Sequence, residues 1–430
     1  MGKTFMPVQK TRAELAAFQL ERLKWTVHHT YHGSPHYRRR FEEAHVTPDT
    51  IRTLDDLKLL PFTTADDLKA GYPFPLLSVP LDDVVRIHAS SGTTGKRKVL
   101  AYTAKDIDDW AHFFARCYEM AGMSSSDRVQ ICVGYGLWTA GAGFQNGCER
   151  FGAMAIPIGP GNLDMQCDLL ADFGATVLCC TASMGLLMAE EVEKRGIRER
   201  INLKKVILGS ERSSEAMRAR IRELLGVEHI FDIPGMTELY GPGTGLDCVY
   251  HQGIHYWADY YIVEFLDPDT LQPVPEGEIG EMVVTTLRKE AAPLVRYRTR
   301  DLTRAIPGTC ACGSILPRHD RFLGRSDDMF IFRAVNVYPG QIDHVLSAIP
   351  GIGSEYQVHL TRGKDGKDYM VVKAERGKEC RAGDDARCKK LIEGEVKKQI
   401  MVSCEADICC YGELPRSERK TKRVFDKRDE

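Results

Sequence analysis

Hydroxyl and glycine residues are concentrated in the stretch S-S-G-T-T-G-K, which begins at Ser90 and follows the strand-like run 84–89. Glycine lets the backbone approach a ligand closely and adopt positive φ values. Serine and threonine hydroxyls add donors beside the exposed backbone N–H groups, and such a concave loop suits a phosphate group. The pattern is not a Walker A motif, because G-x-x-x-x-G-K-[ST] is absent here. The stretch therefore indicates a phosphate-binding loop of another kind, with an ordinary surface turn as the alternative.

A second group of residues has the types that bind metal ions. Cys310 and Cys312 are separated by one residue, so two strand tips could present both to one ion, together with Cys248 and His255. Zinc at structural sites takes four nitrogen or sulfur ligands in a tetrahedron. The spacing by itself is not a standard zinc pattern, so free cysteines remain the alternative. His251 competes with His255 as the histidine of such a site.

The elements that must position these residues follow a regular order. Strand-like runs cover residues 84–89, 129–133, 153–158, 176–180, 205–208 and 228–232. Amphipathic helical patterns lie between them, for example at residues 104–120, 163–173 and 213–225. This alternation predicts an α/β domain with a mainly parallel sheet. Ligands of such sheets bind beyond the carboxyl ends of the strands, where the interesting loops of this chain follow.

The pattern changes in the second half of the chain. It becomes β-rich from Tyr256, with strand-like runs at residues 260–265 and 281–286, and a shorter α+β pattern follows the segment 324–328. We expect a large N-terminal domain of residues 1–326, which includes the β-rich subdomain, and a small C-terminal domain of residues 327–430.

Composition excludes several classes of protein. The 430 residues are 43% hydrophobic and 27% charged, with a net charge of −2, which gives no indication of nucleic-acid binding. No run of 18 apolar residues exists, and the N-terminus lacks an apolar signal core, so we expect a cytoplasmic protein without a membrane span. Most of the fourteen cysteines lie in apolar patterns, which indicates small core residues rather than a disulfide framework.

The longer string R-I-H-A-S-S-G-T-T-G-K, from Arg86 to Lys96, resembles the phosphate loop of the phenylacetate–CoA ligase branch of the acyl-adenylate-forming superfamily. The resemblance continues, in order, from about Thr11 to about Arg428. It implies an N-terminal adenylate-forming domain and a mobile C-terminal lid domain. It also implies ATP, Mg²⁺ and coenzyme A as reactants or cofactors and a structural Zn²⁺.

The same resemblance implies which residues contact ATP and the AMP moiety. They are Ser90, Ser91, Gly92, Thr93, Thr94, Gly95, Lys96, Gly209, Ser210, Glu211, Asp232, Pro234, Gly235, Met236, Thr237, Asp301 and Arg325. Within this set, Thr237 would contact the α-phosphate and Asp301 the two ribose hydroxyls. Glu238 would hold Mg²⁺, since a carboxylate beside a phosphate site needs a cation between them. The alternative for Thr237 is a helix N-cap with an acidic first turn.

Other segments complete the implied machinery. Tyr135, Gly136, Trp138 and Gly209 would line the pocket of the carboxylic acid, because an aryl ring needs an apolar, partly aromatic slot. Lys420 would act with Thr237 and Glu238 in catalysis, with Lys422 as the alternative lysine. Asp327 would be the hinge on which the C-terminal domain swings. Many members of this branch also carry the pattern of Cys248, His255, Cys310 and Cys312, which the resemblance implies as a structural zinc site.

The sequence thus favours an ATP-dependent acid–thiol ligase that adenylates an aryl acid, such as phenylacetate or a relative, and transfers the acyl group to coenzyme A. One alternative is an adenylating enzyme of the same family with a different acceptor, which either adenylylates a deazaflavin coenzyme or activates an acid for biosynthesis without coenzyme A. Another is a non-catalytic nucleotide-binding protein, given Pro234, Ala334 and Arg419. We expect small-molecule partners and no nucleic acid. The sequence leaves open whether the chain forms a homodimer.

Overall fold

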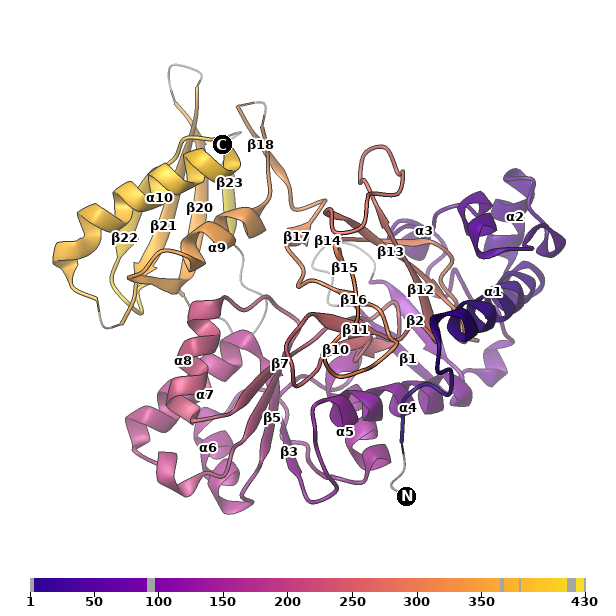
Figure 1. Cartoon of the computed structure of the whole chain (residues 1–430), viewed down its shortest axis with the longest axis horizontal. Coiled ribbons are helices and arrows are strands. Elements are labelled where there is room, and N and C mark those ends of the chain that lie inside the picture. The colour runs from indigo at the N-terminus through magenta and orange to yellow at the C-terminus, as the bar shows by residue number, and fades with distance from the viewer. Residues whose placement is uncertain are drawn as a thin grey trace. The chain divides into compact units, whose positions relative to one another are not determined.

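A computed structural model describes residues 4–90, 97–333, 335–363, 367–378, 380–415 and 423–428 (Figure 1). The chain divides into two compact units. The first comprises Met1–Cys180, Ile201–Ser210 and His229–Arg321, and the second comprises Thr181–Arg200, Glu211–Glu228 and Phe322–Glu430. Each unit is considered by itself.

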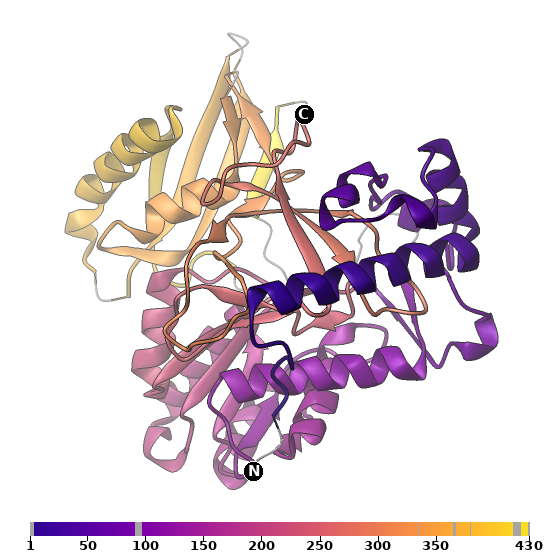
Figure 2. The same ribbon diagram turned by 45° about the vertical axis from the view of Figure 1, so that its right-hand side comes forward.

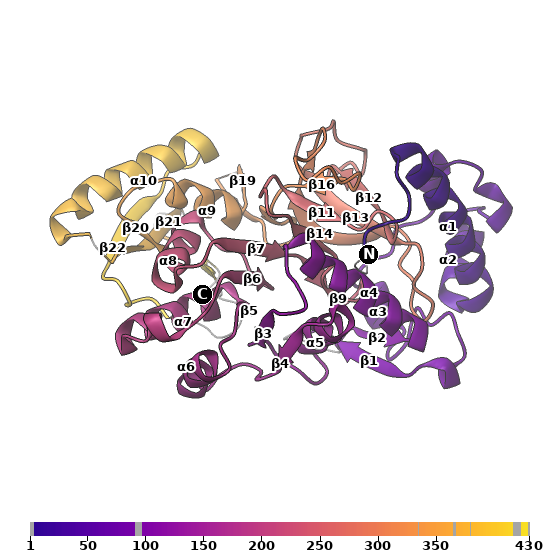
Figure 3. The ribbon, with the colours of Figure 1, turned by 60° about the horizontal axis from the view of Figure 1, so that its bottom comes forward.

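A parallel sheet forms the centre of the first unit. Its five strands are β3 (Arg128–Ile131), β4 (Met154–Ile156), β5 (Val177–Thr181), β6 (Lys205–Gly209) and β7 (His229–Ile233), in the order β4-β3-β5-β6-β7 (Figure 3). β3 pairs in parallel with β4 and with β5, and β6 pairs in parallel with β7. The near-continuous apolar strands are buried, as expected for a sheet covered on both faces. The predicted α/β fold class is confirmed.

The first strand-like run does not belong to this sheet. β1 (Arg86–Ala89) pairs antiparallel with β2 (Val99–Tyr102), with Ala89 opposite Val99. A parallel connection needs a crossover of a dozen or more residues, whereas the nine residues between these strands suit an antiparallel hairpin. The expectation that residues 84–89 open the parallel alternation is therefore wrong, and the S-S-G-T-T-G-K stretch connects the two strands of a hairpin.

Helices of the first unit begin where their capping residues predict. Thr11 accepts from the Glu14 backbone N–H at the start of α1 (Arg12–Gly33), and Thr103 and Asp106 form a reciprocal capping box at the start of α4 (Ala104–Met120). Figure 2 shows the ribbons of both helices, α1 in indigo and α4 in purple. The remaining α-helices of this unit are α2 (Pro35–Glu43), α3 (Asp67–Ala70), α5 (Thr139–Phe151) and α6 (Leu163–Asp172).

Glycines let α5 approach α4 closely. A Cβ on Gly143 would lie 2.5 Å from the Trp110 ring, and one on Gly147 would lie 2.6 Å from the Phe114 ring. Side chains at these two positions would overlap the aromatic core, so the close helix packing requires glycine.

The β-rich region is antiparallel, as the sequence predicts. β12 (Tyr261–Leu266), β13 (Gly280–Thr286) and β14 (Tyr297–Thr303) are consecutive neighbours, with an irregularity in register between Glu281 and Val283. A second sheet has the order β10-β11-β16-β15, and a short hairpin joins β8 to β9. The bounds of these strands are β8 (Gly235–Met236), β9 (Gly241–Pro242), β10 (Gly245–Asp247), β11 (Ile254–Tyr256), β15 (Ala305–Ile306) and β16 (Arg318–His319).

The second unit includes a sheet in the order β22-β21-β20-β23, with α9 and α10 lying on one side of it (Figure 1). Its core includes the fully buried Phe332, Ile342, Val358, Val372 and Ile392. The elements of this unit are α7 (Ala182–Arg195), α8 (Glu215–Leu225), β17 (Gly324–Arg325), β18 (Phe330–Phe332), β19 (Val335–Val337), α9 (Pro339–Ser347), β20 (Ile352–Arg362), β21 (Asp368–Arg376), α10 (Asp385–Ile400), β22 (Glu405–Cys409) and β23 (Val424–Lys427).

The cysteines behave as the composition predicts. All fourteen lie within the described ranges and are free, and only Cys410 is exposed. In the part of the chain that the structure describes, no helix has the length and apolar character of a membrane span.

Candidate active site

The predicted phosphate loop leaves β1 at Ser90, whereas Ser91, Gly92, Thr93, Thr94, Gly95 and Lys96 lie outside the described residues. The Ser90 N–H donates to the Lys98 carbonyl at 3.0 Å, and the Ala89 N–H donates to the Leu137 carbonyl at 2.8 Å. The buried Ser90 hydroxyl has no hydrogen-bond partner among the described residues. The hairpin thus fixes the first residue of the loop beside the segment that connects β3 to α5.

Thr237 and Glu238 lie in the tight turn between β8 and β9. Gly235 cannot carry a side chain, because its Cβ would lie 2.3 Å from the Cα of Pro242. The buried Tyr102 hydroxyl lies 3.1 Å from the Thr237 carbonyl oxygen and 2.7 Å from that of Tyr240. Thr237 begins no helix, so the alternative of an N-cap is wrong.

The Glu238 side chain is a buried carboxylate with two donors. The Lys98 ammonium contacts its Oε1, and the Tyr297 hydroxyl donates to the same oxygen at 3.1 Å. Burial opposes ionisation, but the Lys98 charge outweighs it and holds the pKa of the Glu238 carboxyl below its ordinary value. The carboxylate therefore stays charged at neutral pH. Lys98 lies only two residues after the predicted phosphate loop, so the segment that follows the loop reaches the carboxylate although 140 residues separate Lys98 from Glu238.

A second lysine supports this turn and was not predicted from the sequence. Lys289 is fully buried, and its ammonium donates to the Glu238 backbone carbonyl at 2.9 Å. It lies 4.8 Å from the Tyr102 ring centroid and 5.0 Å from that of Tyr240, which stabilises the cation. Burial lowers the pKa of Lys289 to about 8. No sequence pattern marks this lysine, because its partners come from two segments that are distant from it in the sequence.

The ends of β6 and β7 lie side by side, with Gly209 opposite Ile233. A Cβ on Gly209 would lie 2.9 Å from the Ile233 side chain, so glycine permits this approach. Ser210 follows in a left-handed conformation with φ of 70°. The Asp232 carboxylate forms an ion pair with Arg321 at 2.6 Å. The Pro234 carbonyl, directly after β7, accepts a hydrogen bond from the backbone N–H of Gly243 at 3.0 Å. Gly235 and Met236 of the hairpin follow it.

Asp301 lies on β14, four residues after the Tyr297 that reaches Glu238. It is partly buried, and its backbone N–H donates to the Thr299 hydroxyl at 3.0 Å. One strand therefore carries a residue that contacts the candidate metal ligand and the residue predicted to bind ribose.

Of the predicted acid-pocket residues, Tyr135, Gly136 and Trp138 lie between β3 and α5, whereas Gly209 is the last residue of β6. Trp138 is the N-cap residue of α5, and Tyr135 is about one-third exposed. The Tyr135 ring lies over Gly141, whose Cβ would come within 2.5 Å of it, while Gly136 adopts φ of 85°. Tyr135 and Trp138 thus lie on the segment that also contacts β1.

Four predicted site residues, Glu211, Arg325, Asp327 and Lys420, belong to the second unit. The Glu211 carboxylate accepts from the Ser183 N–H at 2.6 Å, and burial raises the pKa of this carboxyl. The Arg325 guanidinium makes a two-bond ion pair with Asp327, with distances of 2.8 and 2.9 Å. Lys420 and the alternative Lys422 lie outside the described residues.

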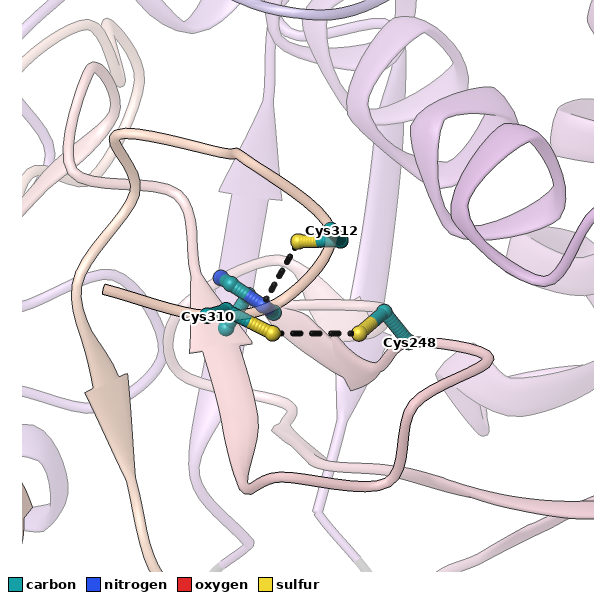
Figure 4. Close-up of side chains that lie close together, drawn as sticks. Cys248, Cys310 and Cys312 are labelled. Atoms are coloured by element: carbon teal, nitrogen blue, oxygen red, sulfur yellow. Dashed lines mark hydrogen bonds between the residues drawn. The ribbon is translucent and has the colours of Figure 1, made fainter.

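The four predicted zinc ligands come together in the first unit (Figure 4). Their ligand atoms all lie within 4.8 Å of one another, and Cys248, His255 and Cys310 are buried. The Cys248 and Cys310 sulfurs are 3.5 Å apart, and the Cys312 sulfur is 3.5 Å from His255 Nε2. Ligands at zinc distances of about 2.0–2.3 Å stand roughly 3.5–3.8 Å apart in a tetrahedron, so this set fits a zinc ion.

Surrounding contacts also fit a metal site. His255 Nδ1 lies 3.1 Å from the Leu316 carbonyl, which leaves Nε2 facing the sulfurs. Burial lowers the pKa of His255 to about 4, so its imidazole is neutral at pH 7. The competing His251 contacts Asp247 at 2.8 Å and His229 at 3.1 Å instead. The structure therefore selects His255 over His251.

Known proteins resemble this chain over nearly its whole length. The AMP-binding enzyme family matches residues 15–287, and its C-terminal domain family matches residues 334–428. The chain is 41% identical over 420 residues to the phenylacetate-coenzyme A ligase of Pseudomonas putida, which covers 96% of this chain and 94% of that protein. It is 41% identical over 422 residues to the enzyme of the same name from Escherichia coli K12, covering 97% and 95%.

Solved structures agree with these relatives. A 2-hydroxyisobutyryl-CoA ligase in the postadenylation state, in complex with 2-HIB-AMP, has a TM-score of 0.88 at 25% identity and covers 97% of this chain and 91% of its own. The chain therefore belongs to the AMP-binding enzyme family and is, within it, a phenylacetate–CoA ligase-like, AMP-forming acid–CoA ligase.

Proposed function

We propose that this enzyme adenylates an arylacetic acid, phenylacetate or a near relative, and transfers the acyl group to coenzyme A. The observation that carries the proposal is the contact between Lys98 and Glu238, which brings the segment directly after the predicted phosphate loop to a buried carboxylate. The phenylacetate-coenzyme A ligases at 41% identity support the choice of acid and acceptor.

The first half-reaction requires charge control at the phosphates. The substrate carboxylate attacks the α-phosphorus of ATP, the bond to the bridging oxygen breaks, and pyrophosphate leaves. Glu238 would hold Mg²⁺, which when bound neutralises phosphate charge. The Lys98 contact at Oε1 keeps Glu238 ionised, and the ionised carboxylate is the form that ligates Mg²⁺. Thr237 would hydrogen-bond the α-phosphate, while Tyr102 and Lys289 fix the turn that carries it.

The second half-reaction needs the coenzyme A thiol at the acyl carbon. The thiol loses its proton and attacks the carbonyl carbon of the acyl-adenylate, and AMP leaves. In our proposal Lys420 serves only the first half-reaction, and the domain of residues 327–430 turns about Asp327 between the two. The exposed Arg325–Asp327 pair on one short segment is compatible with a hinge, since a few backbone dihedrals suffice for such a motion.

The cluster of Cys248, His255, Cys310 and Cys312 would hold a structural zinc ion. Four protein atoms would supply all the ligands of a tetrahedral ion, which would leave no open position for a substrate. The ion would join the end of β10 and the middle of β11 to the turn at residues 310–313. Its contribution would be to the stability of the β-rich region.

Replacing Glu238 by glutamine should abolish most Mg²⁺-dependent pyrophosphate exchange while the protein stays folded. The neutral amide keeps the shape of the side chain but cannot hold the cation beside the phosphates. We expect a loss of roughly 100- to 1,000-fold, the usual effect of removing one charge-stabilising group. Glu278→Gln, the same substitution at an exposed glutamate, is the matched control. Exchange at the parent rate in Glu238→Gln would mean that the metal lies elsewhere.

Protein produced with zinc available should contain one Zn²⁺ per chain by elemental analysis. Cys310→Ser should remove it and lower the melting temperature by about 5 °C or more, because metal binding to a folded site is folding free energy. Cys410→Ser, at the exposed thiol, should change neither quantity. A zinc content near zero in the parent protein would contradict the site.

An aryl acid should be a better substrate than a medium-chain fatty acid. Gly141→Ala should selectively weaken binding of the aryl acid. The added methyl group would overlap the Tyr135 ring, and overpacking by a methylene costs about 1–3 kcal/mol. We expect the KM for the acid to rise roughly tenfold while the KM for ATP stays constant. Gly394→Ala, at an open helical position, is the control. Faster turnover of medium-chain fatty acids than of every arylacetate would rule out the proposed pocket.

Lys420→Ala should separate the two half-reactions. Formation of the acyl-adenylate should fall roughly 100- to 1,000-fold, because a charge aimed at the transition state is lost. Thioester formation from preformed acyl-adenylate and coenzyme A should proceed close to the parent rate. Equal loss of both steps would argue against the alternation, and loss only in Lys422→Ala would identify Lys422 as the catalytic lysine. Turnover that needs no coenzyme A would instead favour an adenylating enzyme with another acceptor.

A further inference from the structure

Asp301 lies in a bulge of β14. Gly280 and Glu281 of β13 pair with Thr303 and Leu302, whereas Val283 and Val284 pair with Arg298 and Tyr297. Three residues of β14, numbers 299–301, therefore face the single residue Met282. Such bulges bend a strand and redirect its side chains, and they are frequent beside active sites.

The bulge satisfies its own polar groups. The Thr299 hydroxyl donates to the Met282 carbonyl at 2.7 Å and accepts the Asp301 N–H at 3.0 Å. Thr299 is buried, so this bridge is shielded from water. The backbone of the bulge is thus fixed on both sides of Arg300.

Arg300 is the central residue of the bulge. Its φ is 68°, in the left-handed region that glycine adopts without a steric penalty and that an arginine adopts only at a cost in free energy. An arginine in such a conformation directly before Asp301 requires a compensating interaction of its side chain.

That interaction is with Glu281. This carboxylate is fully buried on β13 and accepts two bonds from the Arg298 guanidinium, at 2.9 and 2.8 Å. The Arg300 guanidinium lies 3.6 Å from the same Oε2 that Arg298 contacts. One buried carboxylate thus holds the arginine at the start of the bulge and the arginine at its centre.

We propose that Arg300 and Glu281 are positioning residues that direct Asp301 toward the ribose of ATP. The inference rests on the ribose-binding role proposed above for Asp301. The ion pair offsets the cost of the left-handed backbone and fixes the peptide that leads into Asp301. Neither Arg300 nor Glu281 needs to touch the nucleotide for this effect.

The test compares affinities for ATP and for 2′,3′-dideoxy-ATP, which lacks both ribose hydroxyls. We expect the parent protein to prefer ATP by roughly 100-fold, the size expected for two hydrogen bonds to a carboxylate. Arg300→Asn should reduce this preference at least about tenfold, since asparagine tolerates the left-handed conformation but has no charge to pair with Glu281. Arg300→Lys should restore much of the preference. Both equilibrium binding and pyrophosphate exchange give this ratio.

The ratio of the two affinities is unaffected by the amount of folded protein, so general loss of stability does not change it. Arg304→Asn, which removes an exposed arginine that pairs with Asp320 just beyond β14, is the matched control and should keep the parent ratio. Glu281→Gln should lower the ratio in the same direction as Arg300→Asn.

Asp301→Ala separates the inference from the function on which it rests. This variant should bind both nucleotides equally. An Arg300→Asn protein that retains the parent preference, while Asp301→Ala loses it, would overturn the positioning role alone. An Asp301→Ala protein that retains the preference would overturn the ribose role and this inference with it.

Discussion

The buried carboxylate of Glu238 is the group on which the rest of the candidate site depends. A charge removed from water needs cations or hydrogen-bond donors close by, because its desolvation is otherwise strongly unfavourable. Here the Lys98 ammonium and the Tyr297 hydroxyl reach its Oε1, while Lys289 binds the carbonyl of the same residue. Lys98 directly precedes β2, Tyr297 belongs to β14 and Lys289 follows β13, so the contacts of this one residue bring three parts of the chain together.

This requirement also explains the arrangement of the neighbouring aromatic residues. Tyr102 and Tyr240 place their rings around the Lys289 ammonium, and the Tyr102 hydroxyl meets two carbonyl groups of the turn. The rings supply an environment that is apolar in bulk yet favourable to a cation. The turn that carries Thr237 and Glu238 is therefore rigid for reasons that lie outside the turn itself.

Much of the fold could be predicted from local patterns. The caps at Thr11 and Thr103 and the buried strands are determined within short windows, and the structure places them within one or two residues of the predicted bounds. The error at β1 arose because strand pairing is not a local property: residues 86–89 look the same whether their neighbour is parallel or antiparallel. The site shows the same division, since motifs identified Glu238, the cysteines and His255, whereas the roles of Lys98 and Lys289 depend on tertiary contacts.

The distribution of thiols makes this protein suitable for spectroscopic work without prior removal of cysteines. Cys410 directly follows β22 of the second unit and is the exposed member of fourteen free cysteines. A maleimide fluorophore would react there first, because the other thiols are wholly or partly shielded from a bulky reagent. Combined with a fluorescent nucleotide as the energy-transfer partner, one label on the natural sequence would report the proposed movement of residues 327–430 during turnover.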